Sequence, residues 1–152
     1  MVQRCKFSIE LKNFPPDLSG EPIKGKDVVA GNCKYYLNDL SFKNFLYPGF
    51  AYGVGYLLEN AVYLELRRLG YIVYTGSFRD KEVDFVAMKD DRVIYLQATY
   101  MLETAQTMER EYAPLLTIGD NYEKYVVSMD EVQFPSNEGG RHIQAWNLKE
   151  IL

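Results

Sequence analysis

Four polar residues stand out because their side chains could hold a divalent cation. Glu59 falls within a long helical pattern, Asp84 within a strand pattern, and Gln97 and Thr99 within the next strand pattern. Mg²⁺ favours a few carboxylate or amide oxygens together with water. Glu59, Asp84 and Gln97 therefore form a candidate magnesium site, provided that the fold brings them together.

Glu59 has no obvious partner on its own helix. Glu65 can pair with Arg68 three residues later, as helix-surface charges commonly do. Glu59 has only apolar and aromatic neighbours at that spacing, namely Gly55, Tyr56, Val62 and Tyr63. Burying a carboxylate is costly unless it is hydrogen-bonded, paired or bound to a cation. Two interpretations stay open: a hydrogen bond to a nearby backbone group or tyrosine, or a functional role.

A hairpin is predicted around the turn at Asp90 and Asp91. If the turn is centred there, Asp84 lies opposite Gln97 and Glu82 lies opposite Thr99. Side chains alternate between the faces of a strand, and facing Cβ atoms lie ~5 Å apart. The polar residues are therefore expected on one face, which Glu59 could reach from beside the sheet; the alternative is a solvated polar face. The other face is predicted to be core: Val83, Phe85, Ala87, Ile94, Leu96 and Ala98.

The elements that must position these residues follow a mixed α/β order. A long helix is predicted from about residue 52 or 54 to 69, with Gly70 as its stop. Thr104 or Thr107 is expected to cap a second helix that ends near 114–116. Strands are predicted at 35–37, 71–75, 82–88, 93–100, 125–129 and 142–146, and a short amphipathic segment ends at 46. This order predicts one crossover, through the second helix.

The chain length of 152 residues suits one domain. Residues 34–152 are predicted to form it. Residues 1–33 are predicted to be an arm, with a short strand at 7–11 and a turn-rich connector at 14–22, because they carry little apolar periodicity.

The composition narrows the class of protein. The net charge of −4 gives no overall basic field to attract nucleic acid, although a local patch would escape this count. The two cysteines, Cys5 and Cys33, form neither a metal spacing nor a disulfide framework, which suits the cytoplasm. No apolar stretch approaches the ~20 residues that span a bilayer, so no membrane association is expected. His142 has no Cys or Asp around it at a metal-binding or catalytic spacing, so it is expected to be structural or at the surface.

Several segments together match one known family in their order along the chain. They are Gly-Lys at 25–26, Asn-Cys-Lys-Tyr-Tyr-Leu-Asn-Asp at 32–39, Leu-Leu-Glu-Asn at 57–60, Tyr-Leu-Glu-Leu at 63–66, Gly-Tyr at 70–71, Glu-Val-Asp-Phe at 82–85, Gln97, and Asp-Asn-Tyr-Glu-Lys-Tyr at 120–125. In these segments the chain resembles domain of unknown function 4143, which usually follows an AAA+ ATPase core in bacterial and archaeal proteins. The resemblance implies a restriction-endonuclease-like fold of the PD-(D/E)xK superfamily, with a mixed β-sheet flanked by helices.

The resemblance also assigns a role to each candidate residue. Glu59 would be the helix acid, Asp84 the first strand acid, Gln97 the second acid position and Thr99 the lysine position. Threonine cannot supply the positive charge that stabilises developing negative charge during hydrolysis. Glutamine can ligate a metal through its amide oxygen but brings no charge. Lys81 and Arg79 are the nearest basic residues in sequence that could replace the lysine; the alternative is that both belong to a solvated turn.

The chain also lacks the Gly-x-x-x-x-Gly-Lys-Ser/Thr loop that binds ATP phosphates. We therefore expect a C-terminal module of an AAA+ ATP-binding protein, catalytically inactive, whose partners are the upstream ATPase region and a further protein or nucleic acid. The alternative is a Mg²⁺-dependent nuclease that uses Glu59, Asp84 and Gln97. A third possibility is a dimerisation module that uses an aromatic sheet edge; the sequence does not fix the oligomeric state.

Overall fold

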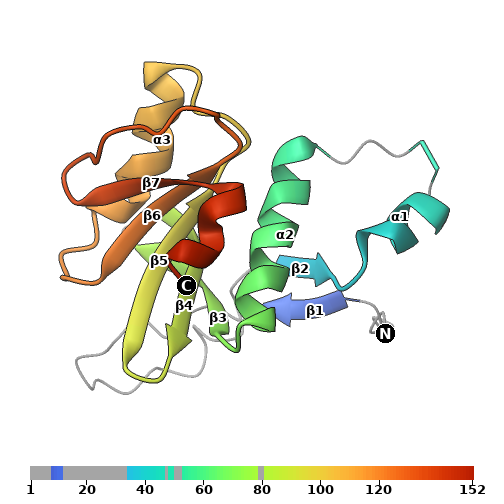
Figure 1. The fold of residues 1–152 in the computed structure, drawn as a ribbon. Helices are drawn as coiled ribbons and strands as arrows, with labels where there is room; N and C mark the ends of the chain where they lie inside the picture. Colours follow the sequence, from blue (N-terminus) through green and yellow to red (C-terminus); the bar gives the residue numbers. More distant parts are fainter. Residues whose placement is uncertain (1–7, 12–33, 47, 50–52, 79–80) are drawn as a thin grey trace.

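The computed structural model describes residues 8–11, 34–46, 48–49, 53–78 and 81–152 (Figure 1). Its centre is a five-stranded sheet with the spatial order β3-β4-β5-β6-β7. The strands are β3 (Ile72–Phe78), β4 (Lys81–Lys89), β5 (Arg92–Ala98), β6 (Glu123–Ser128) and β7 (Gly140–Gln144). The first three are antiparallel, while β5, β6 and β7 run parallel. The predicted α/β fold, a mixed sheet flanked by helices, is confirmed.

Two helices cover opposite faces of this sheet (Figure 1). They are α2 (Val54–Arg68) and α3 (Ala105–Leu116), and α3 makes the predicted crossover between β5 and β6. A short 3₁₀ helix, η1 (Ala145–Glu150), follows β7. β1 (Ser8–Leu11) and β2 (Lys34–Leu37) form a separate two-stranded antiparallel sheet next to α2, and α1 (Leu40–Leu46) follows β2.

The ends of the two long helices follow local sequence signals. Gly70, directly after the C-cap of α2, has a φ of +87°, a conformation that a residue without Cβ adopts at little cost. The sequence left two caps open for α3, and the structure selects Thr104: the backbone N–H of Thr107 donates to its Oγ1 over 3.0 Å. The expected surface pair on α2 is also present, with Arg68 bonded to Glu65 at 2.6 Å.

Two apolar cores stabilise the sheet, one on each face. On the α2 side, Leu58, Val62 and Leu66, spaced four residues apart, pack against inward-facing strand residues. The strand residues of this core are Val73, Phe85, Ala87, Ile94, Leu96, Tyr125, Val127 and Ile143. On the α3 side, Tyr112 and Leu115 pack against Val83, Val86, Val93, Tyr95 and Val126. Both faces of the sheet therefore carry a buried core. Of the polar residues expected together on one face, Asp84 and Thr99 are buried, whereas Gln97 is half-buried and Glu82 is exposed.

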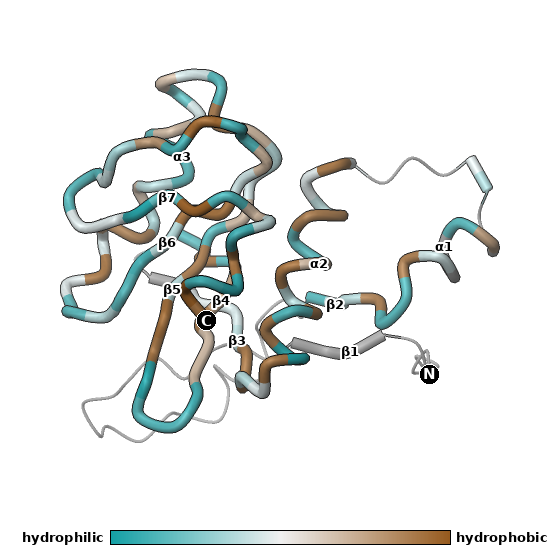
Figure 2. Tube along the Cα trace, viewed as in Figure 1, coloured by the Kyte–Doolittle hydropathy of each residue, from teal (hydrophilic) through white to brown (hydrophobic). Residues whose placement is uncertain are grey.

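The β4–β5 hairpin has the predicted register near its turn, since its pairs run from Phe85 opposite Leu96 to Lys89 opposite Arg92. The expected pairs of Asp84 with Gln97 and of Glu82 with Thr99 do not belong to this ladder. Figure 2 shows its hydrophilic turn between two more hydrophobic strands. Two predictions about its faces are wrong. Val83 belongs to the α3-side core, not to the face that carries Phe85. Asp84 lies on the α2 side with Phe85, where it contacts Lys34, and does not share a face with Thr99.

A β-bulge explains this difference. Tyr74 of β3 pairs with Val86, but Gly76 pairs with Val83, so one residue of β3 lies opposite both Asp84 and Phe85. A bulge re-aims the side chains that follow it along the strand. Val83 consequently points to the α3 side, while the side chain of Asp84 reaches α2. The sequence pattern cannot reveal this, because strict alternation assumes an unbroken ladder.

Part of the predicted N-terminal arm, 1–33, lies outside the described residues, including the connector at 14–22; the short strand predicted at 7–11 corresponds to β1. In the ranges that the structure describes, no helix has the length and apolar character needed to cross a bilayer.

Candidate functional site

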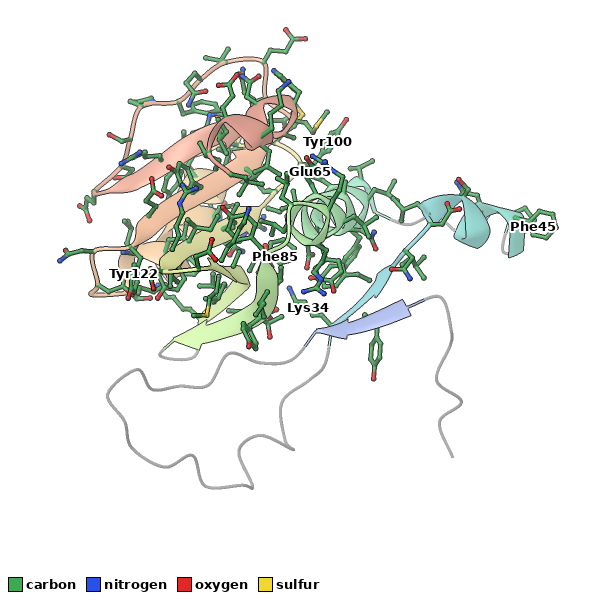
Figure 3. All side chains as sticks on the ribbon, turned by 60° about the horizontal axis from the view of Figure 1, so that its bottom comes forward. Lys34, Phe45, Glu65, Phe85, Tyr100 and Tyr122 are labelled. Atoms are coloured by element: carbon green, nitrogen blue, oxygen red, sulfur yellow. The ribbon has the colours of Figure 1, made fainter. Side chains whose placement is uncertain are left out.

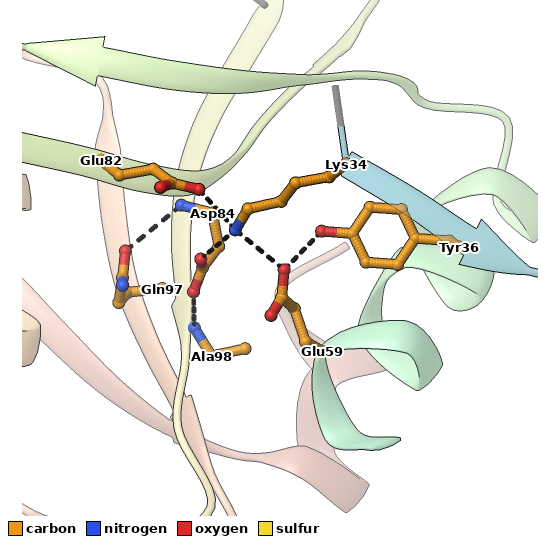
Figure 4. A network of polar contacts seen from close by, with 7 residues as sticks. All are labelled: Lys34, Tyr36, Glu59, Glu82, Asp84, Gln97 and Ala98. Atoms are coloured by element: carbon orange, nitrogen blue, oxygen red, sulfur yellow. Dashed lines mark hydrogen bonds and ion pairs between the residues drawn. The ribbon is translucent and has the colours of Figure 1, made fainter. Parts of the chain in front are cut away.

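The candidate site lies where β2, α2 and the bulged part of β4 meet. Glu59 comes from α2 and Asp84 from β4, and both face the start of β2 (Figure 4). Their side chains are largely buried, with 12% and 10% of their surfaces exposed. The fold therefore brings together the helix acid and the strand acid that the sequence singled out.

Lys34 lies between these carboxylates. Its Nζ donates to Glu59 Oε1 at 3.0 Å and to Asp84 Oδ1 at 2.8 Å, and it forms an ion pair with Glu82 Oε1 at 2.6 Å. Figure 3 shows Lys34 at the end of β2 that adjoins the sheet. An ammonium has three N–H donors, and three carboxylates engage this one. We call Lys34, Glu59, Glu82 and Asp84 the lysine–carboxylate cluster.

Tyr36, on the same side of β2 as Lys34, adds a second contact to Glu59. Its hydroxyl donates to Glu59 Oε1, and its ring stacks on Tyr63 with centroids 4.4 Å apart. Glu59 thus has a cationic and a phenolic partner from one strand. Of the two interpretations that the helix left open, a hydrogen bond to a tyrosine is present, although Tyr36 is remote in sequence.

Asn60 fixes the backbone of the same strand. Its carboxamide accepts from the Leu37 N–H at 2.8 Å and donates to the Leu37 carbonyl at 2.9 Å. Asn60 is 4% exposed, so these bonds also satisfy its own buried polar atoms. Consecutive residues of α2 therefore hold the side chains and the main chain of β2, and the sequence analysis missed this role of Asn60.

Backbone and amide groups hold Asp84 from the sheet side. The N–H of Ala98 donates to Asp84 Oδ2 at 2.9 Å, and the N–H of Asp84 donates to Gln97 Oε1 at 3.3 Å. A bulge leaves a residue without its regular ladder bond, and the Gln97 side chain accepts from the N–H at that position. The oxygen of Gln97 that was a candidate metal ligand is thus engaged with the main chain (Figure 4).

Thr99 stands apart from this arrangement. It is 8% exposed, and its backbone N–H donates to the Val127 carbonyl at 3.0 Å. Within the described ranges, it makes no hydrogen bond to a member of the lysine–carboxylate cluster. The positive charge of the site comes instead from Lys34, which lies fifty residues before Asp84.

The charges in this partly buried space shift one another's protonation. Burial raises the pKa of Asp84 to about 6, against the opposing effect of the Lys34 charge. Burial alone would lower the pKa of Lys34, but the Asp84 charge and hydrogen bonds to Asp84 and Glu82 raise it above its ordinary value. Burial, and then the charge of Glu59, raise the pKa of the Tyr36 hydroxyl. Lys34 therefore remains charged at neutral pH and Tyr36 remains a hydrogen-bond donor.

A magnesium ion does not fit the residues as they are arranged. Lys34 Nζ lies among the carboxylate oxygens, and the Gln97 oxygen is bonded to the backbone. In the part of the chain that the structure describes, no group of three or more His, Cys, Asp or Glu side chains has the geometry of a metal site.

A pocket of about 430 Å³ opens beside the cluster, and Tyr35 and Tyr56 contribute to its wall. A second pocket, of about 530 Å³, adjoins it and shares Glu82 and Gln97. The ionisable residues of the first are one lysine and three acids, which gives a net charge of −2 when all are ionised. Those of the second are Lys81, Arg110, Glu82, Glu109 and Glu111, which gives −1. Among the described residues, the lining of both pockets therefore carries net negative charge.

The remaining sequence candidates lie elsewhere. Lys81 lines the second pocket, and Arg79 falls outside the described residues. His142 is structural and 3% exposed: its Nδ1 accepts from the Phe134 N–H at 3.1 Å, and its Nε2 lies 2.8 Å from Ser128 Oγ. Ser128 in turn donates to Asp130 Oδ2 at 2.6 Å and is fully buried, so this network stabilises the interior.

Comparison with known proteins gives one informative similarity. The chain is 34% identical, over 106 residues, to a protein of Haemophilus influenzae described only as uncharacterized. The match includes 70% of this chain, and the chain spans about a quarter (26%) of that protein's length. No protein-family model and no solved structure matches the chain.

Proposed function

We propose that this chain is a nuclease-fold interaction module without hydrolytic activity, which binds a protein partner within a larger cytoplasmic ATPase. The observation that carries the proposal is the position of Lys34, whose ammonium is engaged by Glu59, Glu82 and Asp84 at 2.6–3.0 Å. An ammonium held in this way stabilises the local structure and has no N–H donor left for a phosphate group.

Hydrolysis of a phosphodiester requires groups that bind where negative charge develops. Here the candidate cation is neutralised by carboxylates of its own chain. The candidate third ligand, Gln97, accepts a hydrogen bond from the Asp84 main chain. Both features favour a module that has lost the chemistry of its fold.

The acidic surface favours a protein partner over nucleic acid. Both pockets at the site carry net negative charge, and the chain as a whole carries −4. Nucleic-acid binding draws most of its affinity from cationic side chains that neutralise phosphates. A polyanion would be repelled here, whereas a basic protein surface would be attracted.

The ATPase assignment rests on the resemblance to domain of unknown function 4143 and is compatible with the longer Haemophilus influenzae relative. About three quarters of that protein lies outside the matched part. A Gly-x-x-x-x-Gly-Lys-Ser/Thr loop in that part would support the assignment, and its absence would contradict it.

One observation favours a second candidate, a Mg²⁺-dependent nuclease. Lys34 brings a positive charge to within 2.8 Å of Asp84, and this is the charge that Thr99 cannot supply. In such an enzyme Lys34 would have to leave Glu59 and Glu82 and turn toward the scissile phosphate.

A cleavage and binding assay separates the two candidates. The purified chain is incubated with labelled single- and double-stranded DNA and RNA, with Mg²⁺ or Mn²⁺, next to an Asp84→Asn control. We expect no cleavage, and no change in fluorescence anisotropy even at low salt. Cleavage that disappears in the Asp84→Asn protein would establish the nuclease instead.

The protein partner is tested with the Haemophilus influenzae relative. Its matched segment and its remaining part are expressed separately, mixed and analysed by size exclusion with light scattering. Co-elution that weakens with rising salt is expected from an acidic docking surface. Independent elution at low salt would contradict the proposal of an internal partner.

A further inference from the structure

Large apolar side chains are exposed at one edge of the five-stranded sheet, where the parallel strands β5, β6 and β7 end. Tyr100 follows β5 by two residues, Met129 follows β6 directly, and Trp146 follows β7 by two residues. Their exposed fractions are 42%, 39% and 49%, and the nearby Met101 and Val132 are exposed by 39% and 66%. Single apolar residues scattered on a surface are ordinary, but five at one edge indicate a contact surface.

Hydrogen bonds place these residues beside one another. The Met129 N–H donates to the Tyr100 carbonyl at 2.9 Å, which joins the ends of β5 and β6. The Gln144 side-chain amide donates to the Glu131 carbonyl at 2.6 Å, which joins the loop after β6 to the end of β7. Figure 1 shows the three strands side by side. We call the five exposed side chains the apolar edge: Tyr100, Met101, Met129, Val132 and Trp146.

Buried residues of the same segments hold the apolar edge in place. Leu102 and Leu148 belong to the two cores, one on each face of the sheet. Asp130 is also buried, and it accepts from the Leu102 N–H at 2.8 Å and from the Ser128 hydroxyl at 2.6 Å. A surface that is already ordered loses little conformational entropy when a partner binds, which favours recognition there.

The charge at this edge has one sign. The segments that form it, 99–103, 129–133 and 144–148, contain Glu103, Asp130 and Glu131 and no lysine or arginine. Glu103 and Glu131 are exposed, whereas Asp130 is bonded within the protein. Complementary charges steer association and exclude wrong partners. Basic residues are therefore expected beside the apolar groups of the partner.

The width of the apolar edge suits one helix. Neighbouring strands lie about 4.8 Å apart, so the ends of three strands span about 10 Å. An α-helix with its side chains has a diameter of about 10–12 Å. Methionine side chains adapt to uneven apolar surfaces, and tryptophan and tyrosine are enriched among the residues that contribute most to binding.

We propose, on the basis of the function inferred above, that the apolar edge is the docking surface for an amphipathic helix of the protein partner, with apolar residues on one face and lysine or arginine beside them. The apolar edge supplies the contact area, and Glu103 and Glu131 supply the complementary charge. Tyr100 lies at the same end of β5 as Gln97, which lines both pockets of the candidate site. The docking surface therefore begins beside that site.

Trp146 reports on this surface directly, because it is the single tryptophan of the chain. Its fluorescence emission is recorded while the full chain is titrated with a Leu/Lys peptide of about 18 residues, patterned as an amphipathic helix. We expect a saturable blue shift and weaker quenching by acrylamide, since a half-exposed indole becomes covered. A Leu/Glu peptide with the same leucine pattern should give no shift, because its acids would face Glu103 and Glu131. A scrambled Leu/Lys peptide should bind more weakly, since it presents no apolar face.

Two tyrosines provide a matched pair of variants. Tyr100→Ser removes a member of the apolar edge, whereas Tyr122→Ser changes a tyrosine of similar exposure, 39%, at the opposite end of the strands (Figure 3). Tyr100→Ser should raise the Kd of the Leu/Lys peptide at least about fivefold, the usual threshold for a residue that matters at an interface. Tyr122→Ser should leave this Kd unchanged. Val132→Ser, at the most exposed of the five positions, serves as a second variant if Tyr100→Ser does not fold.

Four results would overturn the proposal. They are an unchanged Trp146 emission up to about millimolar Leu/Lys peptide, equal binding of the Leu/Glu peptide, equal binding of the scrambled peptide, and equal effects of the two tyrosine variants. A blue shift that grows with protein concentration in the absence of peptide, together with a dimer in light scattering, would also overturn it and would assign this surface to a second copy of the chain.

Failure of the apolar edge and failure of the proposed function are distinguishable. If the two parts of the Haemophilus influenzae relative co-elute but the peptide does not shift Trp146 emission, the apolar edge is refuted and the proposed function stands. Nucleic-acid cleavage by wild type refutes the proposed function whatever Trp146 reports, because the cleavage assay does not depend on the peptide.

Discussion

Replacement of Lys34 by methionine should destabilise the protein by an amount that depends on pH. Removing one partner of a buried ion pair costs about 3–5 kcal/mol, because the other charge is left uncompensated. Glu82 is 59% exposed and contributes little, since exposed pairs are worth at most about 1 kcal/mol. Lys34 is itself 27% exposed, which places the expected loss at neutral pH near the lower limit, about 3 kcal/mol.

The pH dependence follows from Asp84. Its pKa in the folded protein, about 6, is above the ordinary value, so the folded state binds this proton more tightly than the unfolded state. Such a group lowers the free energy of unfolding as pH rises through its folded pKa. The Lys34 charge opposes this upward shift, so its removal raises the pKa of Asp84 further. Each additional pKa unit lowers the free energy of unfolding at high pH by about 1.4 kcal/mol. The deficit of the variant should therefore grow between pH 5 and pH 8.

Urea unfolding at pH 5, 6.5 and 8 measures this deficit, as the difference between wild type and variant at each pH. Taking differences removes the contributions of other titrating groups that both proteins share. Lys149→Met is a matched control, because Lys149 is exposed, and it should change stability by no more than about 0.5 kcal/mol. A deficit that is the same at all three pH values, or below that of the control, would refute the reasoning about the cluster.

Three further predictions concern side chains that do not belong to the lysine–carboxylate cluster. Gln97→Ala should lower the free energy of unfolding by about 1 kcal/mol in the same urea titration, since the Asp84 N–H loses its acceptor. Tyr112→Phe should leave the thermal midpoint unchanged or raise it, because its buried hydroxyl has no hydrogen-bond partner among the described residues; Tyr95→Phe, which removes a 2.6 Å bond to a carboxylate, should lower it. Burial lowers the pKa of His142, so the unfolded state binds more protons and stability should fall as pH drops below about 6.5. His142→Asn should abolish that acid-side loss, and an unchanged slope would show that His142 is not its source.

Much of the fold follows from local patterns in the sequence. The helix over Val54–Arg68 was predictable because Leu58, Val62 and Leu66 repeat every four residues and Gly70 ends the pattern. The register of the β4–β5 hairpin was predictable because the turn at Asp90 and Asp91 fixes which residues face each other. Both signals lie within a few residues of the structure that they specify.

The bulge in β4 could not be predicted in the same way. An alternating pattern holds only where each residue of a strand pairs with one residue of its neighbour. At Asp84 and Phe85 two residues of β4 lie opposite one residue of β3, so the alternation is interrupted. Only the pairing with β3 reveals it. The bulge matters for the candidate site, because it turns Asp84 toward Lys34 and moves Val83 into the opposite core.

Lys34 shows why a motif position alone is a weak guide to the charge of a site. The lysine expected from the family pattern is threonine at position 99, yet the space beside Asp84 contains an ammonium from another strand. Electrostatic balance depends on which charges reach a point in space, and any nearby element can supply them. One local signal was present: Lys34 and Tyr36 alternate on one side of a short strand, so both had to face whatever β2 covers. What β2 covers was beyond local reasoning, since Glu59 and Asp84 lie 25 and 50 residues further along the chain. The same geometry gives the site its dual character, because an ammonium held by three acids of its own chain is both a stabilising contact and an obstacle to any other cation.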